Sequence, residues 1–158
     1  MAPTQTPLRI ENLSLPVVAH HEAAHAVIAL TTGGRVPRAR IWPADAAHWQ
    51  GWVDMEFRDN PEGEHAGALA LLAGAHAERL WLDRHDVPPA SWPHDIDASS
   101  QWDRDLVQEC LRRIPRDQRP LYRAVDREAE RLVARHWDRI EHVAERLIDA
   151  KTLHHVRA

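Results

Sequence analysis

The stretch VVAHHEAAHAVIAL, residues 17–30, decides how the rest of the chain is interpreted. Its alanine, valine, isoleucine and leucine residues favour a helix, and the TTGG sequence at 31–34 provides a plausible helix stop. Within the stretch, residues 21–25 spell H-E-x-x-H. Because helix residues four apart lie on the same face, His21 and His25 can offer two imidazoles to one zinc ion.

Glu22 follows His21 directly and is rotated about 100° around the helix. From there it can reach a zinc-bound water and take its proton, which is the chemistry of metal-assisted hydrolysis, most often of peptide bonds. The chain has 12 histidines among 158 residues, so the motif could also arise by chance on a core helix with solvent-facing polar groups. His20 lies on neither ligand row, and we interpret it as an ordinary helix residue.

Length and composition predict one domain, residues 15–158, that follows an N-terminal tail, residues 1–14. A net charge of -4 gives no basic footprint for nucleic acid. The single cysteine, Cys110, excludes an intramolecular disulfide, and its spacing places it in the core. No apolar run approaches the roughly 20 residues that span a bilayer. The first residues lack a signal-peptide pattern, so a cytoplasmic protein without a membrane segment is expected.

The segments around the motif predict a mainly α domain of about four to six helices with a small β-sheet. Residues 36–57 carry β-branched and aromatic residues in partial alternation, which is typical of a hairpin or a small sheet. Helices are expected at about 64–82 and 94–114. From 121 to 153 apolar residues recur at helical spacing, which predicts one long helix or two helices joined near 136–138.

A catalytic zinc needs three protein ligands, so the two histidines require a partner. Asp95 is one candidate, because it lies on the apolar row of the third helix. An inward-facing carboxylate is costly unless a cation or a metal ion balances it. Equally, Asp95 could be a first-turn carboxylate that the helix dipole favours. The apolar row of this expected third helix consists of Ala98, Trp102, Leu106, Cys110 and Ile114.

Glu78 is the other candidate carboxylate, within the expected second helix. It could be a third ligand, a residue that supports a ligating histidine, or a surface residue. Four further histidines could act as ligands, although no spacing distinguishes any one of them: His65, His76, His85 and His94.

Four segments follow one another in an order known from a single family: AHHEAAHAV at 19–27, LAGAHAERL at 72–80, HDIDAS at 94–99 and LIDAKTL at 147–153. Together they resemble the peptidase domain of the FtsH-type zinc proteases, peptidase family M41. The resemblance extends over nearly the whole chain. Ala24 and His94 depart from it, because the family carries glycine and asparagine at the matching positions.

The resemblance implies a helical zinc-metallopeptidase domain with its small sheet beside the active site. It implies that Asp95 is the third zinc ligand and that Glu78 supports a ligating histidine. Segment 51–57 could form an edge strand that holds a peptide by strand addition, with Gly51, Trp52 and Val53 as substrate contacts. Alternatively, that segment only covers the core.

These observations predict a zinc metalloendopeptidase that acts on peptides or unfolded protein segments. The chain has no Walker A loop, so no ATPase activity of its own is expected, and a separate ATPase or unfoldase could act as a partner. A homo-oligomer is compatible with the sequence. One alternative is a non-catalytic zinc-binding adaptor or regulator, which an intact Glu22 argues against. Another is a helical interaction protein in which the motif is coincidental.

Overall fold

The computed structural model describes residues 14–91 and 95–157, with side chains described except at 91–100. This part of the chain is mainly helical with a small antiparallel sheet, which confirms the expected fold class. The expected N-terminal tail lies outside the described residues except for Ser14, which begins the first helix. The described helices are α1 (Ser14–Thr31), α2 (Pro61–Arg84), α3 (Asp95–Arg113), α4 (Tyr122–Arg135) and α5 (Trp137–Ala150).

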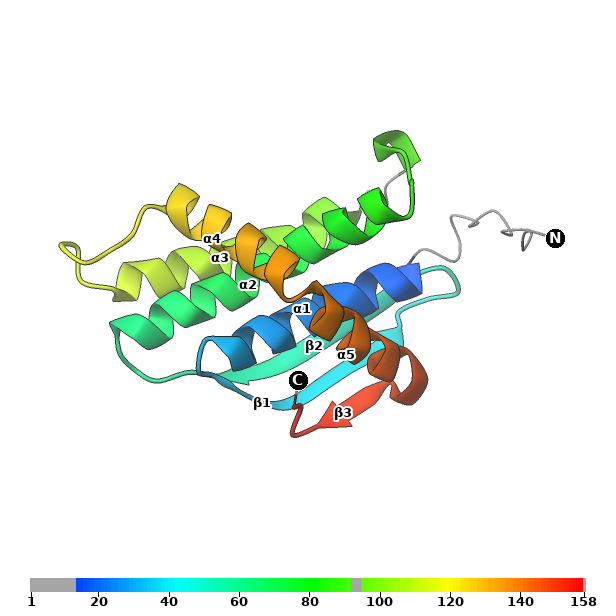
Figure 1. Cartoon of the computed structure of the whole chain (residues 1–158), viewed down its shortest axis with the longest axis horizontal. Helices are drawn as coiled ribbons and strands as arrows, with labels where there is room; N and C mark the ends of the chain where they lie inside the picture. Colours follow the sequence, from blue (N-terminus) through cyan, green and yellow to red (C-terminus); the bar gives the residue numbers. More distant parts are fainter. Residues whose placement is uncertain (1–13, 92–94, 158) are drawn as a thin grey trace.

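Helix α1 lies between the sheet and α2, and α5 packs against α1 and contacts β1 and β3 (Figure 1). Every residue from Ala19 to Ala29 is buried, including the polar residues His20, His21, Glu22 and His25. The helix ends where the Thr31 and Thr32 hydroxyls donate to backbone carbonyls of the last turn and Gly33 adopts a φ of 89°. Even so, no helix in the described ranges is both long and apolar enough to cross a membrane.

Helix α2 packs along α1 on one side and against α3 and α4 on the other. It begins at Asn60, whose side-chain oxygen accepts a hydrogen bond from the Gly63 backbone N–H at 2.8 Å. The residues that α2 buries are mostly small, which lets its backbone approach α1 closely. Those that bear on the site are Ala70 and Gly74.

The sheet confirms the hairpin expected at 36–57. Strands β1 (Arg35–Pro43) and β2 (Trp49–Glu56) pair antiparallel, and α1 packs on both. A third strand, β3 (Thr152–His154), pairs with the other side of β1, which makes β2 an edge strand. We did not expect β3, because the helical spacing continues to residue 153. The last helix instead ends at Lys151, whose φ of 64° turns the chain toward β1.

The C-terminal region forms two helices, α4 and α5, which meet at His136. Both are amphipathic, and their apolar faces are buried against the rest of the domain. This settles the alternative between one long helix and two. Leu121, at the start of α4, is 77% exposed and lies outside the core. The buried apolar residues are Val125, Ala129, Val133, Trp137, Ile140, Val143, Ala144 and Leu147.

The inward face of α3 differs from the apolar row that we expected. Trp102 is 62% exposed, and the buried residues are Val107, Leu111 and Ile114. Placing Trp102 in the core was therefore wrong, because an indole can remain at the surface and does not by itself mark a buried face. Cys110 is half-buried and packs against the core. Four residues before Val107, the inward face continues to a carboxylate, Asp103.

Candidate metal centre

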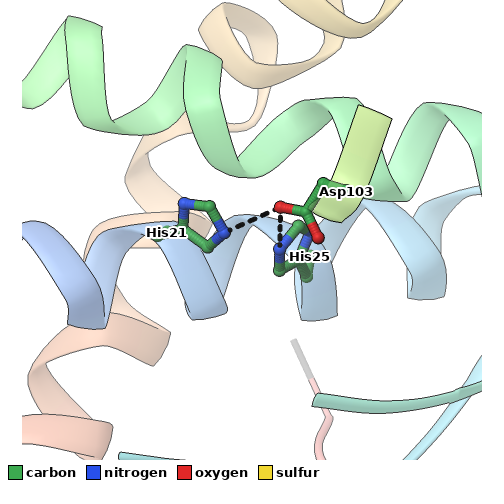
Figure 2. A group of neighbouring side chains, drawn as sticks. All are labelled: His21, His25 and Asp103. Atoms are coloured by element: carbon green, nitrogen blue, oxygen red, sulfur yellow. Dashed lines mark hydrogen bonds and ion pairs between the residues drawn. The ribbon is translucent and has the colours of Figure 1, made fainter. Parts of the chain in front are cut away.

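Two histidines of α1 and one aspartate of α3 converge on a single point (Figure 2). One carboxylate oxygen of Asp103, Oδ2, lies 3.1 Å from His21 Nε2 and 3.4 Å from His25 Nε2. The imidazole rings are nearly perpendicular, with centroids 4.5 Å apart. One donor atom from each of the three residues lies within 4.8 Å of the others, so the group could hold a metal ion.

The other nitrogen of each imidazole is fixed by an acceptor on α2. His21 Nδ1 lies 2.6 Å from Glu78 Oε1, and His25 Nδ1 lies 2.7 Å from the Ala70 carbonyl oxygen. A carbonyl or a carboxylate only accepts hydrogen bonds, so each Nδ1 carries the hydrogen and donates it. In the neutral imidazoles, Nε2 therefore presents a lone pair, as it does in histidines that bind metals.

Both lone pairs point at the Asp103 carboxylate, so a cation is needed between the three groups. Without a metal, protons take that place. Burial opposes a charged His21, but the Glu78 carboxylate and Asp103 outweigh it and raise the pKa of His21 well above 6.5. Burial also opposes charge on His25, whose pKa Asp103 raises. Against its own burial, Asp103 has its pKa held well below the usual value by these two imidazoles.

Two of the three separations between the donor atoms fit a zinc ion. Zinc binds histidine nitrogen and carboxylate oxygen at about 2.0–2.1 Å, so two ligands of a tetrahedral site lie roughly 3.3 Å apart. The two nitrogen-to-oxygen distances on Asp103, 3.1 and 3.4 Å, bracket that value. Three protein ligands of a tetrahedral site also leave the fourth position open, as catalytic zinc sites do.

Glu22 lies beside this group without belonging to it. Its side chain is only 6% exposed, and it lies between α1 and the edge strand β2, against Gly51. Burial raises the pKa of Glu22, and this effect exceeds the opposing influence of the two imidazoles. A carboxylate in these surroundings can both accept a proton and hold it.

Glu78 is buried within α2 and is 3% exposed. One of its oxygens accepts the hydrogen bond from His21, whereas the other, Oε2, is buried with no hydrogen-bond partner among the described residues. One turn earlier on α2, Gly74 packs so closely against the His21 ring that a Cβ on it would lie 2.6 Å from Nε2. Glu78 therefore orients His21 from one side, and Gly74 leaves room for the ring.

Asp103 takes the place beside the histidines for which sequence reasoning favoured Asp95. The Asp95 side chain lies outside the described residues, so its role as a ligand stays a prediction. Asp95 and Asp103 are eight positions apart along α3, which corresponds to about 12 Å of helical rise, so both cannot bind one ion. The signal we overlooked was spacing, since Asp103 precedes Val107 by four residues and Leu111 by eight.

The three residues expected to contact substrate have different surroundings on β2. Gly51 faces α1 and touches Glu22, whereas Trp52 is 44% exposed and its indole N–H donates to Asp54. Val53 is a core residue, so only its backbone could contact a peptide. Their role in substrate binding stays a prediction.

The other histidines named in the sequence analysis that have described side chains have other partners. His65 contacts Glu128 and His76 contacts Asp126, each through Nε2. His20, which lies off the ligand rows, is buried, with Nδ1 2.7 Å from the Pro16 carbonyl. His85 stacks on Trp81, and His94 lies outside the described residues.

No protein-family model matches the chain, and no curated protein matches it either. The resemblance to the M41 peptidases therefore stays a prediction based on the four sequence segments.

Proposed function

We propose that the chain is a zinc-dependent metallopeptidase that hydrolyses peptide bonds in peptides or unfolded protein segments. The observation that carries this proposal is the set of hydrogen bonds on the two histidines. Both Nδ1 atoms donate to acceptors on α2, so both Nε2 atoms face Asp103, and the three residues form a group that could hold a metal ion. His21, His25 and Asp103 would hold the zinc ion.

Glu22 favours hydrolysis over other uses of such a site. Two histidines and a carboxylate also suit Fe²⁺, so the ligand set alone does not determine the reaction. A buried carboxylate beside the ligands, outside the ligand set, has an evident use as a proton acceptor. When bound, zinc acts as a Lewis acid that acidifies water and polarises a carbonyl group.

The proposed work of the chain's own residues is to position groups and to move one proton. Glu22 accepts a proton from the attacking water at its carboxylate and later delivers it to the leaving amine, so that it ends the cycle ionised. Because burial raises the pKa of Glu22, the carboxyl can hold the proton between the two steps. Glu78 and the Ala70 carbonyl keep the two imidazoles in their tautomers throughout.

The edge strand β2 supports a peptide as the substrate. Its outer side is free to pair with a further strand in the described part of the sheet, and Gly51 brings it against Glu22. An extended peptide added to β2 would lie close to the proposed base. A folded segment cannot present an extended strand in this way, which favours peptides and unfolded segments as substrates.

The test compares zinc content and cleavage of unfolded casein for the wild type and Glu22→Gln. We expect both proteins to bind about one zinc ion per chain. The variant should lose about 100-fold or more of the cleavage rate, because the amide cannot accept the proton. Glu130→Gln, at an exposed position of α4, is the matched control and should cleave like the wild type.

Three outcomes would contradict the proposal. Equal cleavage rates of the wild type and Glu22→Gln would show that Glu22 is not the proton acceptor. Zinc binding without cleavage by the wild type would favour the adaptor alternative. Absence of zinc binding would exclude both.

A further inference from the structure

The edge strand meets the proposed base at a residue without a side chain. Gly51, on the face of β2 that packs on α1, pairs with Ile41 of β1. A Cβ built on Gly51 would lie 2.3 Å from Glu22 Cγ, 2.7 Å from Cδ and 2.6 Å from Oε1. The Glu22 side chain thus fills the notch that the glycine leaves. Contacts under 3.0 Å cannot persist, so any larger residue at 51 must displace something.

The strand is held on both sides of this notch. Its pairing with β1 runs from Trp49 to Glu56, and the Trp49 backbone N–H donates to the Ser14 hydroxyl at the start of α1. A side chain at position 51 would therefore move Glu22 rather than the strand. The three contacted atoms include the carboxyl carbon, so the whole carboxylate would shift and not only its tip.

We propose that Gly51 is a positioning residue, whose missing side chain sets where the Glu22 carboxylate lies relative to the metal ligands. The inference rests on the proposed function, because it concerns the base of that reaction. It differs from a role in substrate binding, since Gly51 acts through Glu22. The inference also gives two glycines of the site different roles. Gly51 leaves room for the Glu22 side chain, whereas Gly74 leaves room for the His21 ring.

The chain offers a matched control for an added methyl group. Gly67 is also a buried glycine, in α2, but a Cβ there would meet only ordinary contacts, at 3.5 Å from Phe57 and 3.6 Å from Cys110. Gly67→Ala should therefore leave both zinc content and cleavage unchanged. Gly74→Ala should lower zinc affinity, because its methyl group would strike the His21 ring.

The first experiment measures zinc content, kcat and KM for casein-derived peptides with Gly51→Ala. We expect wild-type zinc content, a KM within about twofold and a kcat about 100-fold lower, since a misplacement of about 1 Å at a reacting group costs rate by that order. An unchanged kcat would overturn the inference. Loss of zinc together with activity would also overturn it, because the effect would then lie on the ligands.

The second experiment needs no enzymatic activity. Thermal unfolding is measured for the wild type, Gly51→Ala, Glu22→Ala and the double variant. We expect Gly51→Ala to lower Tm in the wild-type background and to have little effect when Glu22 is already alanine, because the atoms it strikes are then gone. Equal Tm losses in both backgrounds would overturn the inference.

These two measurements distinguish the inference from the proposed function. If the zinc-loaded wild type does not cleave peptides, the proposed function fails. The unfolding cycle still decides whether Gly51 positions the Glu22 side chain, since it depends on the contact alone. A cycle without coupling, beside an active wild type, would reject the role of Gly51 and keep the peptidase.

Discussion

The two helices that carry the proposed metal ligands, α1 and α3, differ in how these side chains are held. The side chains of His21 and His25 are 7% and 6% exposed, and α2 fixes the outer nitrogen of each. The Asp103 side chain is 16% exposed, and its ion pairs are with the two imidazoles themselves. Helix α1 therefore offers a prepared half-site, whereas α3 completes it through contacts that the bound cation would strengthen.

The comparison shows why a motif can point to a candidate metal site and still leave its proposed ligand set incomplete. H-E-x-x-H places two ligands on one helix by local geometry alone. The third ligand depends on which turn of a distant helix packs against them. Asp95 and Asp103 lie on the same helix, and tertiary packing chooses between them.

The strongest test of the difference between α1 and α3 is to replace each of the two aspartates of α3, Asp95 and Asp103, by alanine in turn. We expect Asp103→Ala to lower zinc affinity by more than the roughly 10–100-fold that loss of a supporting hydrogen bond costs, because a ligand is removed. Asp95→Ala should bind zinc like the wild type. Zinc affinity measured by competition with a chelator checks both. If Asp95→Ala lowered zinc affinity and Asp103→Ala did not, Asp95 would be the ligand, and an earlier turn of α3 would face the histidines.

Glu78→Gln tests the α1 half of the proposed site, where a hydrogen bond from His21 to α2 holds the imidazole ring. The amide oxygen can still accept a hydrogen bond from His21 Nδ1, but the negative charge that strengthens this bond is lost. We expect zinc affinity to fall about 10–100-fold, which is less than for Asp103→Ala. The same competition assay measures it, with the exposed Glu145→Gln of α5 as control. An unchanged affinity would mean that α2 does not prepare the half-site.

The smallest expected effect concerns the packing of α3 beyond the site. Burial and the nearby Glu64 raise the pKa of Cys110 from 9.0 to about 11. At pH 8 its thiolate fraction, and with it the rate of alkylation by iodoacetamide, should be about 100-fold below that of an ordinary cysteine. The control is Gln108→Cys with Cys110→Ser, which places the thiol at an exposed position of the same helix. Equal rates would show that this half of α3 is not packed.

The parts of the fold that follow from the sequence are those specified locally. The first helix, its stop at Gly33 and the hairpin of β1 and β2 follow from periodicity and turn residues. The break at His136 has no proline or glycine to mark it, so spacing alone left one helix and two open. Strand β3 depends on pairing with β1, and three residues carry too little pattern to predict such a pairing.

The site was predictable in the same uneven way. Its two histidines and Glu22 could be read from one motif. Asp103 needed the inward face of α3, where the few apolar residues allow two neighbouring rows. The support for His25 could not be read at all, because it comes from the Ala70 backbone carbonyl, which every residue type carries.

The two glycines at the site have a consequence for which mutations can disturb it. Gly51 and Gly74 contribute only the space they leave empty, against Glu22 and His21. Mutations usually weaken a site by deleting a functional group, but here we expect one additional methyl group to suffice, with every proposed ligand and the proposed base still present. A search for related chains should therefore record what is missing at these two positions, in addition to the side chains that are present.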